Sequence, residues 1–128
     1  MIDHMKKMVY VTDDDQDMRE VLSYALESDG YHVRSYENAL KAFESLETLP
    51  EEDLPSMILV DYLMPDMDGV TFIKLLKGTS EMLGKIPLVM STAMGKKEIK
   101  QSLPSNVIHM NKPMDLDELL SVTRSHCS

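Results

Sequence analysis

Five short runs of apolar residues divide the chain, and segments with a helical spacing of apolar residues separate them. Such runs, bounded by turn residues, predict strands that are buried on both faces of a sheet. The second run alternates between apolar and polar residues and is the weakest of the five. The runs occupy residues 8–11, 31–36, 57–60, 86–90 and 107–110.

Between the runs, apolar residues recur three and four positions apart, which is the spacing of one face of an amphipathic helix. We expect Asn38 and Asp115 to cap two of these helices. Residues 79–85 predict a loop or a frayed helix end, whereas residues 96–103 predict a short helix that ends before Pro104. The four clear faces comprise Met18, Val21, Leu22, Ala25 and Leu26; Ala39, Leu40, Ala42, Phe43 and Leu46; Val70, Phe72, Ile73 and Leu76; and Leu116, Leu119 and Leu120.

Strands therefore alternate with helices along the chain, in five successive pairs. This order predicts an α/β fold in which a parallel sheet is covered by helices on both faces. The length of 128 residues suffices for one compact domain with a hydrophobic core.

Composition excludes several classes of function. The net charge of −9 argues against direct binding of nucleic acid, which needs a basic surface. No apolar stretch approaches the length that spans a membrane, and the N-terminus lacks the apolar core of a signal peptide. We therefore expect a cytoplasmic protein that binds neither nucleic acid nor membrane. Cys127 is the only cysteine, so an internal disulfide is excluded.

Polar side chains of particular kinds follow four of the five predicted strands. Because the carboxyl ends of parallel strands meet at one edge of a sheet, we expect these side chains to lie together. Taken singly, each is typical of an ordinary turn, and the acidic triplet 13–15 is typical of a solvated helix cap. Their shared position at successive strand ends favours a functional site instead. The residues are Asp13 and Asp14, Asp61, Thr92 and Lys112.

Three carboxylates within a few ångströms of one another repel, so one of them takes up a proton or a cation neutralises them. Oxygen ligands suit a hard divalent cation, and Mg²⁺ is the usual choice where a phosphate also binds. The cysteine and the four histidines do not have the spacing of a zinc site. A carboxylate beside Mg²⁺, opposite an ammonium group and a hydroxyl group, can attack phosphorus as a nucleophile.

These motifs resemble those of the receiver domains of two-component response regulators, and most closely the single-domain, chemotaxis-regulator-like members. Residues 9–19 resemble the family's acidic-pair segment, 60–69 (VDYLMPDMDG) its phosphoacceptor segment, 90–93 its switch-hydroxyl segment and 111–113 its lysine-proline segment. The resemblance implies a flavodoxin-like sheet with the strand order 2-1-3-4-5. It also implies a receiver domain over residues 7–126, preceded by a tail at residues 1–6.

The resemblance implies a role for each site residue. Asp61 would accept a phosphoryl group from a histidine kinase or a histidine phosphotransfer protein. Lys112 and Thr92 would contact this group, and the peptide bond between Lys112 and Pro113 would be cis. Thr92 and His109 occupy the switch positions, where the family usually carries Tyr or Phe in place of this histidine. The implied Mg²⁺ ligands are Asp13, Asp14, Asp61 and the backbone carbonyl of Leu63.

We therefore expect a phosphorylation-switched signalling domain, with no enzymatic activity beyond its own phosphorylation and dephosphorylation. Its output would be a change in protein–protein interactions, for which a phosphorylation-dependent dimer is one form.

Two alternatives stay open at this point. The first is a receiver-like interaction module that phosphorylation does not regulate. His109 keeps this alternative open, whereas the intact set of Asp13, Asp14, Asp61, Thr92 and Lys112 argues against it. The second is a Mg²⁺-dependent phosphatase or phosphotransferase with an aspartyl-phosphate intermediate. Such enzymes usually carry a second acid two residues after the nucleophile, where this chain has Leu63, and no inserted cap domain supplies a substrate pocket.

Overall fold

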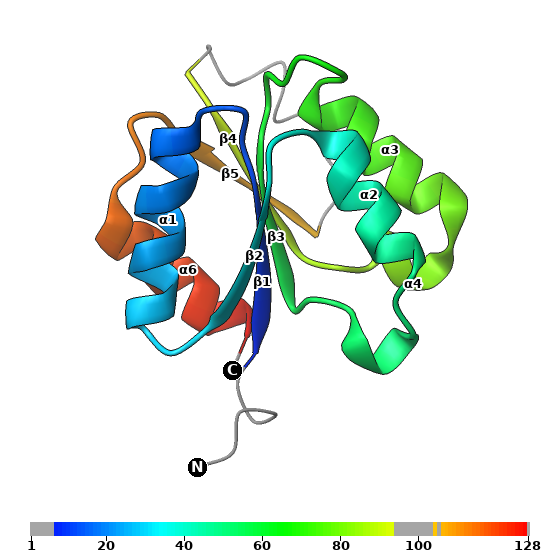
Figure 1. Ribbon diagram of the computed structural model, residues 1–128, viewed down its shortest axis with the longest axis horizontal. Helices are drawn as coiled ribbons and strands as arrows, with labels where there is room; N and C mark the ends of the chain where they lie inside the picture. The colour runs from blue at the N-terminus through cyan, green and yellow to red at the C-terminus, as the bar shows by residue number, and fades with distance from the viewer. Residues whose placement is uncertain (1–6, 94–103, 105, 128) are drawn as a thin grey trace.

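The structure is a computed structural model that describes residues 7–93, 104 and 106–127. Its centre is a five-stranded parallel sheet with the strand order β2-β1-β3-β4-β5 (Figure 1). This order confirms the predicted fold class. The tail at residues 1–6 and the helix predicted at 96–103 lie outside the described residues. The strands are β1 (Met8–Thr12), β2 (His32–Tyr36), β3 (Met57–Asp61), β4 (Leu88–Thr92) and β5 (Val107–Asn111).

Helices cover both faces of the sheet, as predicted. In Figure 1, α1 and α6 lie on one side of the sheet, and α2, α3 and α4 lie on the other. None of the helices within the described residues combines the length and the apolar character needed to cross a membrane. The helices are α1 (Gln16–Ser28), α2 (Ala39–Glu47), α3 (Gly69–Thr79), α4 (Glu81–Gly84) and α6 (Leu116–His126), with a 3₁₀ turn, η2 (Glu51–Asp53), between α2 and β3.

Two predicted caps are confirmed by their hydrogen bonds. The side chain of Asn38 accepts the N–H of Lys41 at 2.8 Å at the start of α2. The side chain of Asp115 accepts the N–H groups of Asp117 and Glu118 at the start of α6. Both caps satisfy amide groups that have no partner within the first turn of a helix.

Three features differ from the sequence predictions. The short helix α4 occupies part of 79–85, because the Ser80 side chain caps it through the N–H of Leu83 at 3.1 Å. Strand β4 starts at Leu88, not at residue 86, because the N–H of Ile86 is used in the turn after α4. The predicted helix faces are too wide, since Val21 and Leu40 are 49% and 48% exposed.

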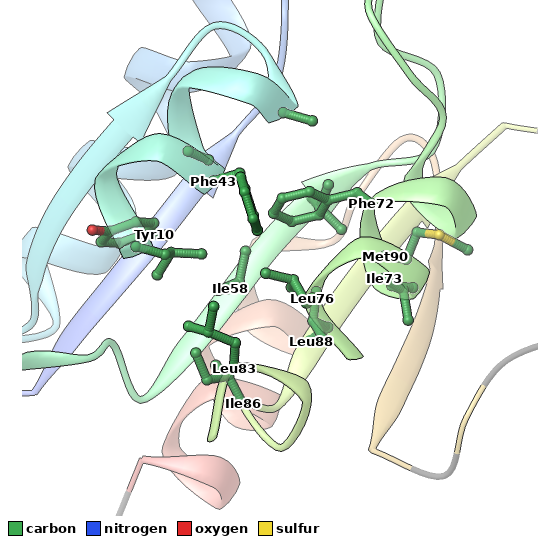
Figure 2. Close-up of a cluster of buried hydrophobic side chains, with 14 of the residues drawn as sticks. Tyr10, Phe43, Ile58, Phe72, Ile73, Leu76, Leu83, Ile86, Leu88 and Met90 are labelled. Carbon is green, nitrogen blue, oxygen red and sulfur yellow. The ribbon is translucent and has the colours of Figure 1, made fainter. Parts of the chain in front are cut away.

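Side chains of the strands alternate between two hydrophobic cores, which explains why the strands consist of continuous apolar runs. Ile58 and Val60 of β3 belong to the core beneath α2 and α3, whereas Met57 and Leu59 belong to the core beneath α1 and α6. Figure 2 shows the first core, where the rings of Phe43 and Phe72 lie over the sheet.

Gly69, the first residue of α3, is packed closely against Met90 and Tyr62. A Cβ atom at this position would lie 2.7 Å from the Met90 sulfur and 3.2 Å from the Tyr62 Cα. The Gly69 N–H donates to the Tyr62 carbonyl at 2.7 Å. The absence of a side chain therefore allows the segment after β3 to fold back tightly against β4.

A partly buried hydroxyl cluster attaches α2 to the sheet. The Ser45 hydroxyl is 2.7 Å from the Tyr10 hydroxyl and accepts the Tyr36 hydroxyl at 2.8 Å. The rings of Tyr10 and Tyr36 lie 4.9 Å apart. Tyr10 is fully buried, and this burial raises the pKa of its phenol. Since the phenol cannot reach water, its hydrogen bonds are made with the hydroxyl groups of Ser45 and Tyr36.

Replacing Ser45 by alanine is expected to lower the free energy of unfolding by about 0.5–1.5 kcal/mol, because it removes one hydrogen-bond partner from the buried Tyr10 hydroxyl and from the Tyr36 hydroxyl. Urea denaturation measures this change. The double variant Tyr10→Phe/Ser45→Ala is the control, and it should recover part of the loss because the buried hydroxyl is then absent. A Ser45→Ala variant as stable as the wild type would contradict the assigned role of the cluster.

Candidate functional site

Three carboxylates gather at the carboxyl ends of β1 and β3. These strands are parallel neighbours with Thr12 opposite Val60, so the residues that follow, Asp13 and Asp61, emerge side by side. Asp13, Asp14 and Asp61 each offer an oxygen within 4.8 Å of the others. Asp13 and Asp61 are buried, and Asp14 is exposed.

Lys112 brings a positive charge to this cluster from the end of β5. Its Nζ lies 3.0 Å from the Oδ2 of Asp61 and 3.9 Å from the Oδ2 of Asp13. The Lys112 N–H donates to the Thr92 carbonyl at 3.0 Å, which joins the ends of β5 and β4. The peptide bond between Lys112 and Pro113 is cis, as the family resemblance implies.

The three residues of the acidic triplet 13–15 have different roles. The Oδ1 of Asp13 accepts the Asp15 N–H at 2.9 Å, and its carbonyl accepts the Arg19 guanidinium at 2.8 Å. Asp15 caps α1 by accepting the Met18 N–H at 3.2 Å. The helix-cap interpretation is therefore correct for Asp15, whereas Asp13 and Asp14 belong to the carboxylate cluster.

The cluster carries more negative than positive charge. Burial raises the pKa of Asp13 above its ordinary value, and the nearby Asp61 raises it further. The hydrogen bond from the Asp15 N–H and the charge of Lys112 act in the opposite direction. The folded-state pKa of Asp13 is therefore higher than its ordinary value of 3.8. As the pH rises from 3.8 through the folded-state pKa, ionisation of Asp13 lowers the free energy of unfolding.

The segment after β3 surrounds Asp61. The Leu63 N–H points to the Oδ1 of Asp61 at 3.4 Å, and the Tyr62 N–H donates to the Ser91 carbonyl at 2.8 Å. The Leu63 side chain is exposed. These bonds tie the segment both to Asp61 and to the neighbouring strand β4.

The two predicted switch residues, Thr92 and His109, lie at different distances from the carboxyl ends of their strands. Thr92 is buried and ends β4, directly after Ser91, which lies opposite Asp61. His109 is half-buried within β5 and lies opposite Met90, two residues before the end of that strand. The structure thus brings Thr92 to the same edge as the carboxylates and places His109 further inside the sheet.

The donor set fits a hard divalent cation. All three clustered side chains offer carboxylate oxygens, which are the ligands that Mg²⁺ and Ca²⁺ prefer. The excess of negative charge in a partly buried place also favours a cation there. In the part of the chain that the structure describes, this is the one group of three or more acidic, histidine or cysteine residues with such spacing.

Known proteins share this sequence pattern. The family model of the response regulator receiver domain matches residues 9–124. The response regulator receiver protein CpdR of Brucella abortus is 31% identical over 117 residues, which cover 90% of this chain and 92% of that protein. The transcriptional regulator NtrC of Proteus hauseri is 30% identical over 119 residues, but the matched part is only 24% of its length.

Solved structures share the fold. The chemotaxis protein CheY4 of Vibrio cholerae has a TM-score of 0.83 and 23% identity, over 94% of this chain and 98% of that one. A receiver domain from Francisella has a TM-score of 0.81, also at 23% identity, over 94% of this chain and 95% of that one. Together with the family match, these findings place the chain in the response regulator receiver domain family of two-component signalling.

One residue near the site was not singled out from the sequence. Asp66, in the segment after β3, accepts backbone N–H groups of α2. These partners are 26 and 27 residues away along the chain, so no local pattern indicates the contact. The aspartate-rich sequence around Asp66 is typical of a turn and does not indicate a contact with α2.

Proposed function

We propose that this receiver domain accepts a phosphoryl group on Asp61 and thereby switches its interactions with other proteins. The donor would be a histidine kinase or a histidine phosphotransfer protein. The observation that carries the proposal is the contact between Asp61 and Lys112, at 3.0 Å, in a cluster with two further carboxylates. A buried nucleophile, a cation and a group of oxygen ligands are what phosphoryl transfer requires.

The proposed metal is Mg²⁺. Asp13, Asp14 and Asp61 would hold it, together with the backbone carbonyl of Leu63, since these are hard oxygen ligands. When bound, Mg²⁺ would neutralise negative charge on the oxygens of the incoming phosphoryl group. The same charge would offset the burial of the Asp13 carboxylate and its repulsion by Asp61, both of which raise the pKa of Asp13.

The protein side chains supply the rest of the chemistry. A carboxylate oxygen of Asp61 attacks phosphorus, while the bond from phosphorus to the donor imidazole nitrogen breaks and its electron pair stays on the imidazole. Lys112, which pairs with Asp61 before transfer, would pair with the phosphoryl oxygens afterwards. The Thr92 hydroxyl, buried at the end of β4, would donate a further hydrogen bond to them.

Switching would follow from these new contacts. A phosphoryl group that binds Thr92 more strongly in one arrangement of the β4 and β5 ends shifts the population towards that arrangement. His109, which is half-buried on β5, would change its packing in the same step. The phosphatase alternative gains no support, since exposed Leu63 stands where that class usually carries a second acid.

The Asp13→Asn variant tests the metal site. Without metal at neutral pH it should be more stable than the wild type, because a buried carboxylate that its neighbours repel is replaced by a neutral amide. This advantage should vanish as the pH falls below the ordinary Asp value of 3.8, where the wild-type carboxyl is protonated in both states. Mg²⁺ at about 100 times its Kd should stabilise the wild type by about 2.7 kcal/mol and the variant far less.

Urea unfolding with and without Mg²⁺ measures both effects. Asp15→Asn is the matched control, since Asn also caps helices and residue 15 lies outside the cluster. Equal stabilisation of the wild type and Asp13→Asn by Mg²⁺ would mean that the ion binds elsewhere.

Intact-protein mass after incubation with Mg²⁺ and acetyl phosphate tests the function itself. One phosphate adduct is expected, and EDTA should prevent it. If no adduct forms although Mg²⁺ binding is demonstrated separately, the protein is an interaction module that phosphorylation does not regulate.

A further inference from the structure

The loop between β3 and α3 is attached to α2 through one carboxylate. The Oδ2 of Asp66 accepts the Leu40 N–H at 2.8 Å, and its Oδ1 accepts the Ala39 N–H at 3.3 Å. Both oxygens of the side chain are therefore directed towards the first turn of a helix that precedes β3 in the chain.

Two residues share the capping of α2. Asn38 accepts the Lys41 N–H from its own place at the start of the helix. Asp66 accepts the two remaining amides of the first turn from a separate loop. These amides have no acceptor within the helix, and a negative charge at a helix N-terminus is favourable. The loop and the helix end thus stabilise each other.

The same loop carries Asp61 and Leu63 at its start. Its end is held separately, since the Gly69 N–H donates to the Tyr62 carbonyl and Asp68 caps α3 through the Thr71 N–H, both at 2.7 Å. Between these points, the Met64 side chain is buried in the core. Asp66 adds the link that connects the middle of the loop to a different helix.

We propose that Asp66 is a positioning residue, which holds the β3–α3 loop in the geometry that phosphorylation of Asp61 needs. This inference rests on the proposed function of the site. With both oxygens engaged by α2, the Asp66 carboxylate is kept away from the carboxylate cluster, and the loop backbone at Leu63 is held beside Asp61. Small displacements of reacting groups have large effects on rate, so this restraint acts on the reaction rather than on folding alone.

Asp66→Ala and Asn38→Ala form a matched pair of variants. Each removes a cap of α2, but only Asp66→Ala releases the loop. Two readouts are needed: amide hydrogen exchange of residues 62–68, and the rate of phosphate adduct formation with acetyl phosphate at fixed Mg²⁺. We expect Asp66→Ala to accelerate exchange in the loop and to slow adduct formation, each by roughly fivefold to tenfold. Asn38→Ala should change both readouts far less than Asp66→Ala, although it lowers stability, because Asp66 still accepts the Ala39 and Leu40 N–H groups.

Three results would overturn the inference. They are equal effects of the two variants, unchanged exchange in the loop of Asp66→Ala, and faster exchange with an unchanged phosphorylation rate. If the wild type itself forms no adduct, the proposed function fails, and the inference that Asp66 serves phosphorylation fails with it. The exchange readout then still decides whether Asp66 holds the loop. If Asp66→Ala does not fold, Asp66→Asn, which keeps one acceptor oxygen, should show the same two effects at smaller size.

Discussion

The Asp61→Asn variant is expected to form no phosphate adduct under conditions in which the wild type is fully phosphorylated. The amide keeps the shape of the side chain but has no carboxylate oxygen to attack phosphorus. Asp61 is 6% exposed and lies in a cluster with too few positive charges, so loss of its charge should leave the fold intact. Intact-protein mass spectrometry over a time course with acetyl phosphate and Mg²⁺ measures the outcome.

Asp68→Asn is the matched control for this substitution. Asp68 lies in the same loop but caps α3, and Asn is an equally good cap, so adduct formation should continue at the wild-type rate. An adduct that persists in Asp61→Asn would mean that another residue is the nucleophile. Asp13 and Asp14 would then be the first candidates, because their oxygens lie within 4.8 Å of Asp61.

The Lys112→Met variant is expected to be phosphorylated about a hundredfold more slowly than the wild type. Removing one preorganised group that stabilises developing charge typically lowers a rate by about 10²–10³. Lys112 is the cation that contacts Asp61, at 3.0 Å, and its side chain is only 29% exposed, so water does not fully replace it. Methionine preserves the length and most of the packing of the lysine side chain.

Lys85→Met serves as the control for Lys112→Met. Lys85 pairs with Glu81 on an exposed surface, so its loss should leave the phosphorylation rate unchanged. The Lys112→Arg variant should recover only part of the rate, because a planar guanidinium does not occupy the position of a compact ammonium group. A Lys112→Met rate within about threefold of the wild type would contradict an electrostatic role for Lys112 in transfer.

The central part of the site could be predicted because it depends on topology. Short apolar runs and helical spacing indicate alternating strands and helices, and parallel strands place their carboxyl ends at one edge. Asp61 ends β3, whereas Asp13 and Lys112 directly follow β1 and β5, so the sheet brings Lys112 within contact distance of both carboxylates. Caps such as Asn38 could be predicted because their partners lie within four residues along the chain.

Features that depend on neighbours distant in the sequence could not be predicted. Apolar spacing does not define how much of a helix the sheet covers, and Val21 and Leu40 proved to be half exposed. The contact of Asp66 with α2 joins residues 26 and 27 positions apart, and an aspartate in a turn gives no sign of such a partner. Thus the sequence indicates which groups meet at the sheet edge, and the packing of loops and helices decides how firmly they are held there.

Chemical trapping of the phosphorylated residue tests the central claim most directly. Borohydride reduces an aspartyl phosphate to homoserine, which peptide mass spectrometry locates in the sequence. After treatment of the wild type with acetyl phosphate and Mg²⁺, we predict homoserine at position 61 and at no other position. Homoserine at position 13 or 14, or none despite a phosphate adduct on the intact protein, would contradict the account.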